Sequence, residues 1–169
     1  MPNYNVGIVL VADEETGSRK GIDYVLRRTK AFKKKDLIIV PDAGNEHGTL
    51  IEVAEKGILW LKFKTLGKQA HGSTPHKGIN SFKAACFFVS ELETLYHTFK
   101  DKDPLFDPPI STFEPTKKEA NVPNINTIPG EDVFYMDSRI LPKYTIDQVE
   151  QEIKKIAKRI EAKFKVKIT

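Results

Sequence analysis

The sequence lacks most of the features that mark secreted and membrane proteins. It contains a single cysteine, Cys86, so it cannot hold an internal disulfide framework. No apolar run approaches the roughly 20 residues that a membrane-spanning helix needs. The first residues, MPNYNVG, do not form the basic and then apolar segments of a signal peptide. We therefore expect a cytoplasmic protein without a membrane partner.

A strong excess of either charge is also missing. There are 27 Lys and Arg against 23 Asp and Glu, a net charge of +4, and the lysines of 154–167 are interleaved with acids. Nucleic-acid-binding surfaces usually gather basic and aromatic residues on one side, whereas Phe134 and Tyr135 of a predicted strand point to opposite faces. We expect no nucleic-acid partner and keep a basic ferredoxin-like nucleic-acid binder as the last of three hypotheses.

Residues 1–56 predict a β-α-β crossover. The apolar runs VGIVLV (6–11) and LIIV (37–40) are too short for lone helices and are typical of strands buried on both faces. A helix is predicted between them over 19–30. The unit contains too little sheet to close a core, because at least one strand edge would remain open.

Both apolar runs end on carboxylates. Asp13, Glu14 and Glu15 follow the first run, and Asp42 follows the second. Ligands of open α/β sheets bind beyond the carboxyl ends of the strands, where a cation would neutralise such a cluster. An acidic helix N-terminus and an ordinary turn would explain the same residues. Both interpretations stay open on this pattern alone.

Residues 57–169 predict a second domain with a ferredoxin-like βαββαβ order. Thr145 and Gln148 form a capping box that begins its second helix. The predicted strands cover 58–66, 110–114, 132–140 and 164–168; the predicted helices cover 81–99 and the segment after 145. The fold class is therefore a partial α/β segment followed by an α+β domain, with the boundary near 55–57.

Three further sites carry residues suited to chemistry. A glycine-rich loop, 67–80, holds His71 and His76, whose imidazoles can ligate metal or donate to an oxyanion. Asn126 lies in the NTIPG segment. Arg139 ends a predicted strand and suits a carboxylate ligand, although the pattern alone favours a surface ion pair.

The ordered motifs resemble the two-zinc exopeptidase and deacylase family, which includes acetylornithine deacetylase, succinyl-diaminopimelate desuccinylase, aminoacylase and the glutamate carboxypeptidases. They are closest to archaeal members of that family. The resemblance covers essentially the whole chain and rests on five motifs: VADEETGS (11–18), PDAG (41–44), GKQAHGSTPHKGINS (67–81), NTIPG (126–130) and DSR (137–139).

The resemblance implies a role for each candidate residue. Glu14 is similar to the general acid/base that activates the attacking water, and Glu15 and Asp42 are similar to ligands of the two zinc ions, for which cobalt is a substitute. His71 resembles the histidine that stabilises the oxyanion in the active site of a partner subunit. Asn126 and Arg139 match substrate-binding positions.

Other family ligands are missing from this sequence. The family pattern requires a histidine and a bridging aspartate upstream of residue 1 and a histidine downstream of residue 169. We therefore expect the middle part of a longer homodimeric enzyme of amino-acid biosynthesis that hydrolyses the amide bond of an N-acyl amino acid or small peptide. By itself, this chain is expected to bind zinc weakly and to be inactive. The alternative hypothesis is a dimerisation module without catalytic activity.

Overall fold

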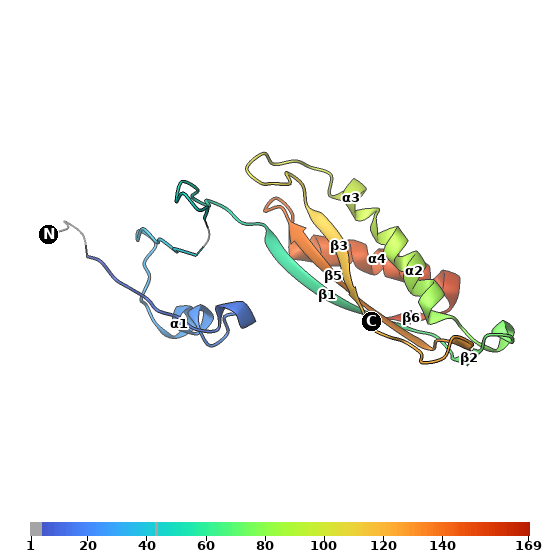
Figure 1. The fold of residues 1–169 in the computed structure, drawn as a ribbon. Helices are drawn as coiled ribbons and strands as arrows, with labels where there is room; N and C mark the ends of the chain where they lie inside the picture. The colour runs from blue at the N-terminus through green and yellow to red at the C-terminus, as the bar shows by residue number, and fades with distance from the viewer. Residues whose placement is uncertain (1–4, 43) are drawn as a thin grey trace. The chain divides into compact units, whose positions relative to one another are not determined.

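A computed structural model describes residues 5–42 and 44–169 of the chain. These residues fall into two units, Met1–Ile51 and Glu52–Thr169, each of which is described by itself (Figure 1). Among the described residues, no helix combines the length and the apolar character needed to cross a membrane.

The first unit contains little regular structure. A 3₁₀ turn, η1 (Glu14–Thr16), is followed by α1 (Ile22–Arg28), which is shorter than the predicted helix 19–30. The predicted strands 6–11 and 37–40 are wrong for this structure, because neither segment enters a β-ladder. Leu10 and Leu37 are 91% and 90% exposed, so the side chains of both apolar runs are not buried as the prediction requires. A strand needs a paired neighbour for its backbone groups, and the described part of this unit supplies none.

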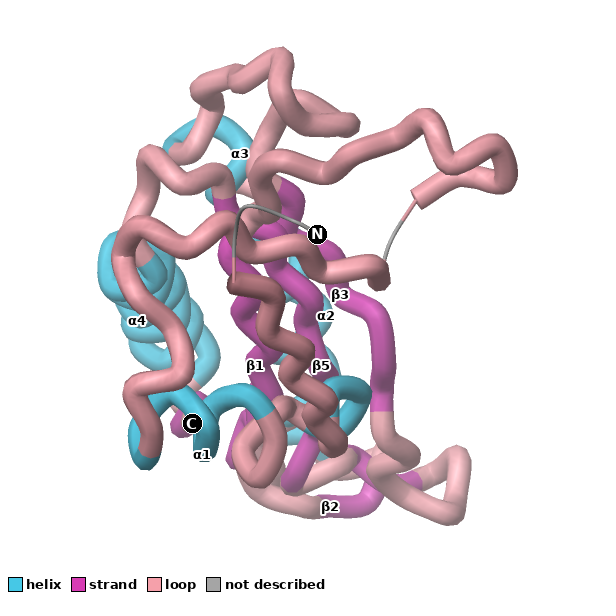
Figure 2. The backbone as a smooth tube through the Cα atoms, turned by 90° about the vertical axis from the view of Figure 1, so that its left-hand side faces the viewer, coloured by secondary structure: helices cyan, strands magenta, loops and turns pink. Residues whose placement is uncertain are grey.

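The second unit forms a four-stranded antiparallel sheet with the strand order β3-β5-β1-β6. Its strands are β1 (Gly57–Leu66), β3 (Thr112–Lys118), β5 (Glu131–Ile140) and β6 (Lys167–Ile168). β1 and β5 pair over ten residues, from Gly57 opposite Ile140 to Leu66 opposite Glu131. Figure 2 shows these two strands running together through the unit. The order of elements confirms the ferredoxin-like prediction.

Two helices begin at capped residues. α2 (Ser81–Leu92) starts after Asn80, whose side chain accepts a hydrogen bond from the Lys83 amide. α4 (Ile146–Phe164) starts at the predicted capping box of Thr145 and Gln148. The predicted helix 81–99 is instead divided into α2 and α3 (Leu95–Thr98). The hydroxyl of Thr94 donates to the Glu91 carbonyl at 2.7 Å, so it competes with the helical hydrogen bonds there.

The edge strand β3 continues to Lys118, past the predicted end at Glu114. Pro115 is tolerated within it because an edge strand has one unpaired side. The register shifts between Pro115 and Lys117, which marks a β-bulge or a similar irregularity. The last predicted strand, 164–168, shortens to β6 because α4 extends to Phe164.

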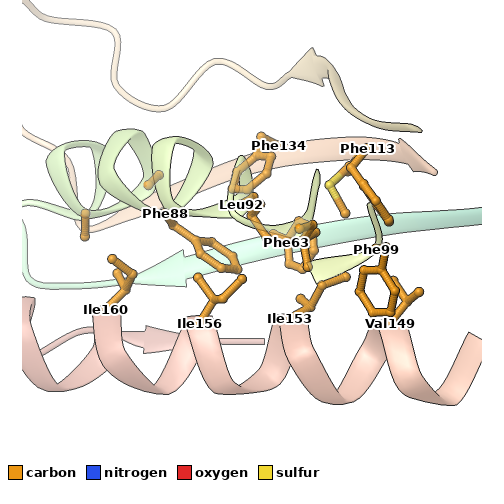
Figure 3. Packing of buried hydrophobic residues seen from close by; sticks show 14 of the residues in the cluster. Phe63, Phe88, Leu92, Phe99, Phe113, Phe134, Val149, Ile153, Ile156 and Ile160 are labelled. Carbon is orange, nitrogen blue, oxygen red and sulfur yellow. The ribbon is translucent and has the colours of Figure 1, made fainter. Parts of the chain in front are cut away.

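The core lies between one face of the sheet and the helices. Phe63 of β1, Phe88 of α2 and Phe134 of β5 contact one another, with centroid distances of 5.0 to 5.8 Å. α4 closes the core with a stripe of buried residues at helical spacing (Figure 3): Val149, Ile153, Ile156 and Ile160. Trp60 and Tyr135 lie on the opposite, helix-free face, because side chains alternate along a strand.

Replacement of the α4 cap should weaken this unit measurably. Thr145→Ala removes the acceptor of the Gln148 amide and leaves that N–H without its cap. We expect a loss of about 1 kcal/mol in the free energy of unfolding, measured by urea denaturation. Thr145→Ser keeps the acceptor and serves as the control, so an equal loss in both variants would contradict the capping role.

Candidate functional site

His71 and Asn126 are brought together by a small ladder outside the main sheet. β2 (Ala70–His71) pairs with β4 (Thr127–Ile128), which places His71 opposite Thr127. Nε2 of His71 lies 3.4 Å from Nδ2 of Asn126, and the Gly72 amide donates to the Asn126 carbonyl at 2.7 Å. Two residues that are 55 positions apart in the sequence therefore share one site.

Glycines make the close packing around this ladder feasible. A Cβ built on Gly67 would lie 2.2 Å from the Ile79 carbonyl oxygen, and one on Gly130 would lie 2.9 Å from the Gln69 amide nitrogen. Neither position has room for a side chain, because backbone atoms form the contact. A larger residue at position 67 would separate the two ends of loop 67–80, and one at position 130 would separate the NTIPG segment from that loop.

The surroundings of His71 favour one tautomer of its ring. The Ser73 backbone amide donates to Nδ1 at 3.2 Å, and the Ser73 hydroxyl lies 2.7 Å from the same atom. Because a backbone N–H can only donate, Nδ1 is the acceptor and the proton of the neutral ring resides on Nε2. Sequence reasoning missed Ser73, although its position two residues after His71 in the HGS segment was a usable signal.

With its proton on Nε2, His71 offers a donor beside the Asn126 amide. With this tautomer, Nε2 of His71 and Nδ2 of Asn126 are both donors and cannot form a hydrogen bond with each other across 3.4 Å. Both can donate to one oxyanion. Both side chains are exposed on the surface of this unit, so a second surface is needed to exclude water from any bound substrate.

Arg139 is held on the helix-free face of the sheet. Its Nε donates to Asp137 Oδ1 at 2.8 Å and its Nη2 donates to Asp137 Oδ2 at 3.0 Å. The Trp60 indole N–H also donates to Oδ2, at 2.7 Å. Hydrogen bonds from Arg139 lower the pKa of Asp137, and the carboxylate raises the pKa of Arg139. The ion-pair interpretation of Arg139 is thus observed, although 42% of its side chain remains exposed.

This ion pair gives stability that depends on pH. Because the folded pKa of Asp137 lies below its ordinary value of 3.8, its contribution is present above that value and is lost as pH falls below it. We expect Asp137→Asn to lower the free energy of unfolding more at about pH 7 than at about pH 3, in urea titrations at both values. An equal loss at the two pH values would contradict this assignment.

Arg139 lies far from His71 along the sheet. Arg139 pairs with Ile58 at the start of β1, whereas the loop that carries His71 leaves β1 after Leu66. Eight residues of strand separate the two ends by about 26 Å, at 3.3 Å for each residue. One chain therefore cannot present both residues to the same small substrate.

The acidic candidates lie in the first unit and are exposed. Glu14 and Glu15 belong to η1, and Asp42 follows the second apolar run. Asp13 has a left-handed backbone with φ +70, and its carboxylate accepts hydrogen bonds from the Thr16 hydroxyl and the Lys20 amide. Asp13 is therefore a turn residue. Among residues 5–42 and 44–169, no three or more His, Cys, Asp or Glu side chains form a group that could hold a metal ion.

The fold and the paired donors define a ferredoxin-like domain with a loop-borne candidate site at one end of its sheet. The chain belongs to the M20 family, because the peptidase dimerisation domain of that family matches residues 53–165. This match covers most of the second unit.

Two archaeal relatives are similar over most of the chain. An uncharacterized metallohydrolase of Methanocaldococcus jannaschii is 47% identical over 169 residues, which cover 98% of this chain and 41% of the relative. An uncharacterized metallohydrolase of Methanococcus maripaludis is 48% identical over 155 residues, or 90% of this chain and 37% of the relative.

A named enzyme also matches the chain. The succinyl-diaminopimelate desuccinylase of Pelagibacter ubique is 26% identical and matches 96% of this chain and 42% of the enzyme. The chain thus spans about two fifths of the length of these curated relatives.

A solved structure supports the same family. A putative aminohydrolase from methicillin-resistant Staphylococcus aureus is 26% identical, with a TM-score of 0.57 over 68% of this chain and 29% of that one. A hydantoinase/carbamoylase family amidase from Burkholderia ambifaria shares the fold at 21% identity, with a TM-score of 0.56 over 68% of this chain and 27% of that chain.

Proposed function

We propose that this chain is part of a metal-dependent hydrolase that cleaves the amide bond of an N-acyl amino acid or a small peptide in the cytoplasm. Residues 1–56 belong to its catalytic domain, and residues 57–169 form its dimerisation domain. The observation that carries the proposal is the pair of donors, His71 and Asn126, exposed beside each other at one end of the sheet. Relatives that are metallohydrolases and desuccinylases support the same reaction class.

Glu15 and Asp42 are the proposed zinc ligands of this chain. Carboxylates are suitable zinc donors, but two of them do not complete a coordination shell. Since the chain spans about two fifths of the length of its relatives, we assign the remaining ligands to segments outside these 169 residues, in an active site that holds two zinc ions or cobalt in their place. Bound zinc would polarise the substrate carbonyl and make a water molecule more acidic.

The other residues of the chain have separate tasks in the proposed reaction. Glu14 takes the proton from the attacking water and passes it to the leaving amine. The N–H groups of His71 and Asn126 donate to the oxyanion that develops on the carbonyl oxygen. Arg139 binds the carboxylate of the substrate.

The distance between Arg139 and His71 favours an active site shared between two subunits. Because Arg139 cannot reach the same small substrate as His71 of its own chain, we assign the two residues to different active sites and Arg139 to that of its own subunit. His71 and Asn126 lie at the other end and would serve the partner. In this homodimer, dimerisation and catalysis depend on each other.

The nucleic-acid hypothesis has less support. Phe134 is buried in the core, being 4% exposed, so it cannot stack on a base. Tyr135 lies on the other face, with the Nζ atoms of Lys62 and Lys117 at 5.3 and 5.0 Å from its ring centroid. Glu119 accepts hydrogen bonds from Tyr135 and Lys62 and neutralises part of that charge.

Metal removal tests the proposed function directly. The longest polypeptide encoded around this segment should release free amine from a panel of N-acetyl and N-succinyl amino acids. A chelator should abolish this activity and added zinc should restore it.

The 169-residue chain is the matched control. It should bind zinc weakly in calorimetry and should not hydrolyse the panel, because its ligand set is incomplete. Hydrolysis by the long polypeptide that survives chelation would contradict the proposed chemistry. Tight zinc binding by the short chain would contradict the assignment of missing ligands.

A further inference from the structure

Among the residues that the structure describes, hydrogen bonds hold the guanidinium of Arg139 along one of its edges. Asp137 occupies Nε and one N–H of Nη2 through a bidentate contact of 2.8 and 3.0 Å. A guanidinium carries five N–H donors in a planar fork, so the edge formed by Nη1 and the second N–H of Nη2 can still donate to a carboxylate. The ion pair therefore fixes the side chain while it leaves a binding edge available.

Trp60 fixes the carboxylate that holds Arg139. It is the cross-strand neighbour of Asp137, and its indole N–H donates to Oδ2 at 2.7 Å. Asp137 and Arg139 are two positions apart on β5, so their side chains share the helix-free face with Trp60. Trp60 is 71% exposed, although burial of its ring would be favourable. Its directed contact on this face is the hydrogen bond to Asp137.

We propose that Asp137 and Trp60 are positioning residues that hold Arg139 with its free edge ready for the carboxylate of the substrate. The proposal rests on the substrate-binding role proposed above for Arg139. A free arginine side chain would lose rotamer freedom when it binds a ligand, which costs affinity. Holding it beforehand removes part of that cost.

An ordinary surface ion pair within the same chain supplies the comparison. Arg27 Nε donates to Asp23 Oδ1 at 2.8 Å, the same distance as in the Arg139 pair. However, its side chain is 76% exposed and its aspartate 39%, against 42% and 27% for Arg139 and Asp137. A positioned arginine should differ from Arg27 in its dynamics.

The first arm of the test uses the 169-residue chain and NMR of arginine side chains. We expect the Nε–H of Arg139 to exchange with water at least about tenfold more slowly than that of Arg27. Asp137→Asn should abolish this protection, and Trp60→Phe should reduce it. Equal exchange of the two arginines in the unmodified chain would overturn the proposal.

The second arm measures kinetics in the long, metal-loaded polypeptide. Asp137→Asn and Trp60→Phe should raise KM for an N-acetyl amino acid, by about tenfold for the first, with kcat within about twofold. The substrate with a carboxamide in place of its carboxylate should show no such change. Glu131→Gln, which breaks the exposed Lys64–Glu131 pair elsewhere on β5, is the control and should leave both constants unchanged.

Arg139→Lys separates the two proposals. If Arg139→Lys raises KM while Asp137→Asn and Trp60→Phe do not, the positioning role is wrong and the proposed function stands. If Arg139→Lys also leaves KM unchanged, Arg139 does not bind the carboxylate, so its substrate-binding role and the positioning role both fail, while the metal-removal experiment still decides the proposed hydrolysis. Circular dichroism of each variant verifies the fold, and Trp60→Phe carries the test if Asp137→Asn does not fold.

Discussion

Two inactive variants of the long polypeptide should restore activity when they are expressed together. In a Glu14→Ala subunit the proposed base is missing, and in a His71→Ala subunit the oxyanion donor is missing. If His71 acts in the active site of the partner, a mixed dimer keeps one complete site. Random assembly makes half of the dimers mixed, so we expect about one quarter of the wild-type activity.

Each variant alone should be strongly impaired. His71→Ala should lower kcat by about 10²–10³-fold, the usual effect of removing one oxyanion donor. Glu14→Ala should lower kcat by about 10²–10⁴-fold, because proton transfer loses its base. Both effects are measured as initial rates on an N-acyl amino acid at saturating substrate.

His76 provides the matched control for this experiment. It lies in the same loop as His71 but belongs to the 3₁₀ turn η2 (Pro75–Lys77), so His76→Ala should retain activity. Co-expressed Glu14→Ala and His71→Ala subunits that stay as inactive as the separate ones would place both residues in one subunit's site. That result would refute the shared active site.

Loss of Phe88 should strongly destabilise the second unit. Phe88 is fully buried, and its ring meets Phe63 edge-on at 5.1 Å and Phe134 at 5.8 Å. Phe88→Ala removes these contacts and leaves a cavity, which costs about 3–5 kcal/mol in the free energy of unfolding. Domains of this size are stable by about 5–15 kcal/mol, so a large share of the stability would be lost.

The neighbouring residue supplies a control on the same helix. Phe87 is 44% exposed and packs against Phe164 at 4.9 Å, so Phe87→Ala should cost only about 1 kcal/mol. Urea unfolding followed by far-UV circular dichroism measures both values. Similar losses for the two variants would show that the core is not organised around Phe88.

The sequence alone predicts most of the second unit. The capping box at Thr145 and the apolar stripe after it identify α4 correctly, because helix signals are local. The order of strands and helices likewise identifies the ferredoxin-like fold. The break after Leu92 and the passage of β3 through Pro115 were missed, since a hydroxyl that competes within the helix and a free sheet edge decide them.

The first unit shows the limit of pattern reasoning. The apolar runs 6–11 and 37–40 have the composition of buried strands, but they remain exposed and unpaired in this structure. A strand forms when a neighbour satisfies its backbone and covers its side chains. The proposed positions of Glu14, Glu15 and Asp42 in a metal site therefore stay predictions.

The identities of the candidate residues were determined by the sequence: a loop histidine, an asparagine before Thr-Ile-Pro-Gly, and an arginine at a strand end. Their arrangement was decided by the tertiary structure. Pairing of β2 with β4 places Asn126 beside His71, and the register of β1 with β5 places Arg139 at the other end, held by Asp137 and Trp60. The physical reason is that strand pairing joins residues far apart in the chain, so local patterns do not contain it.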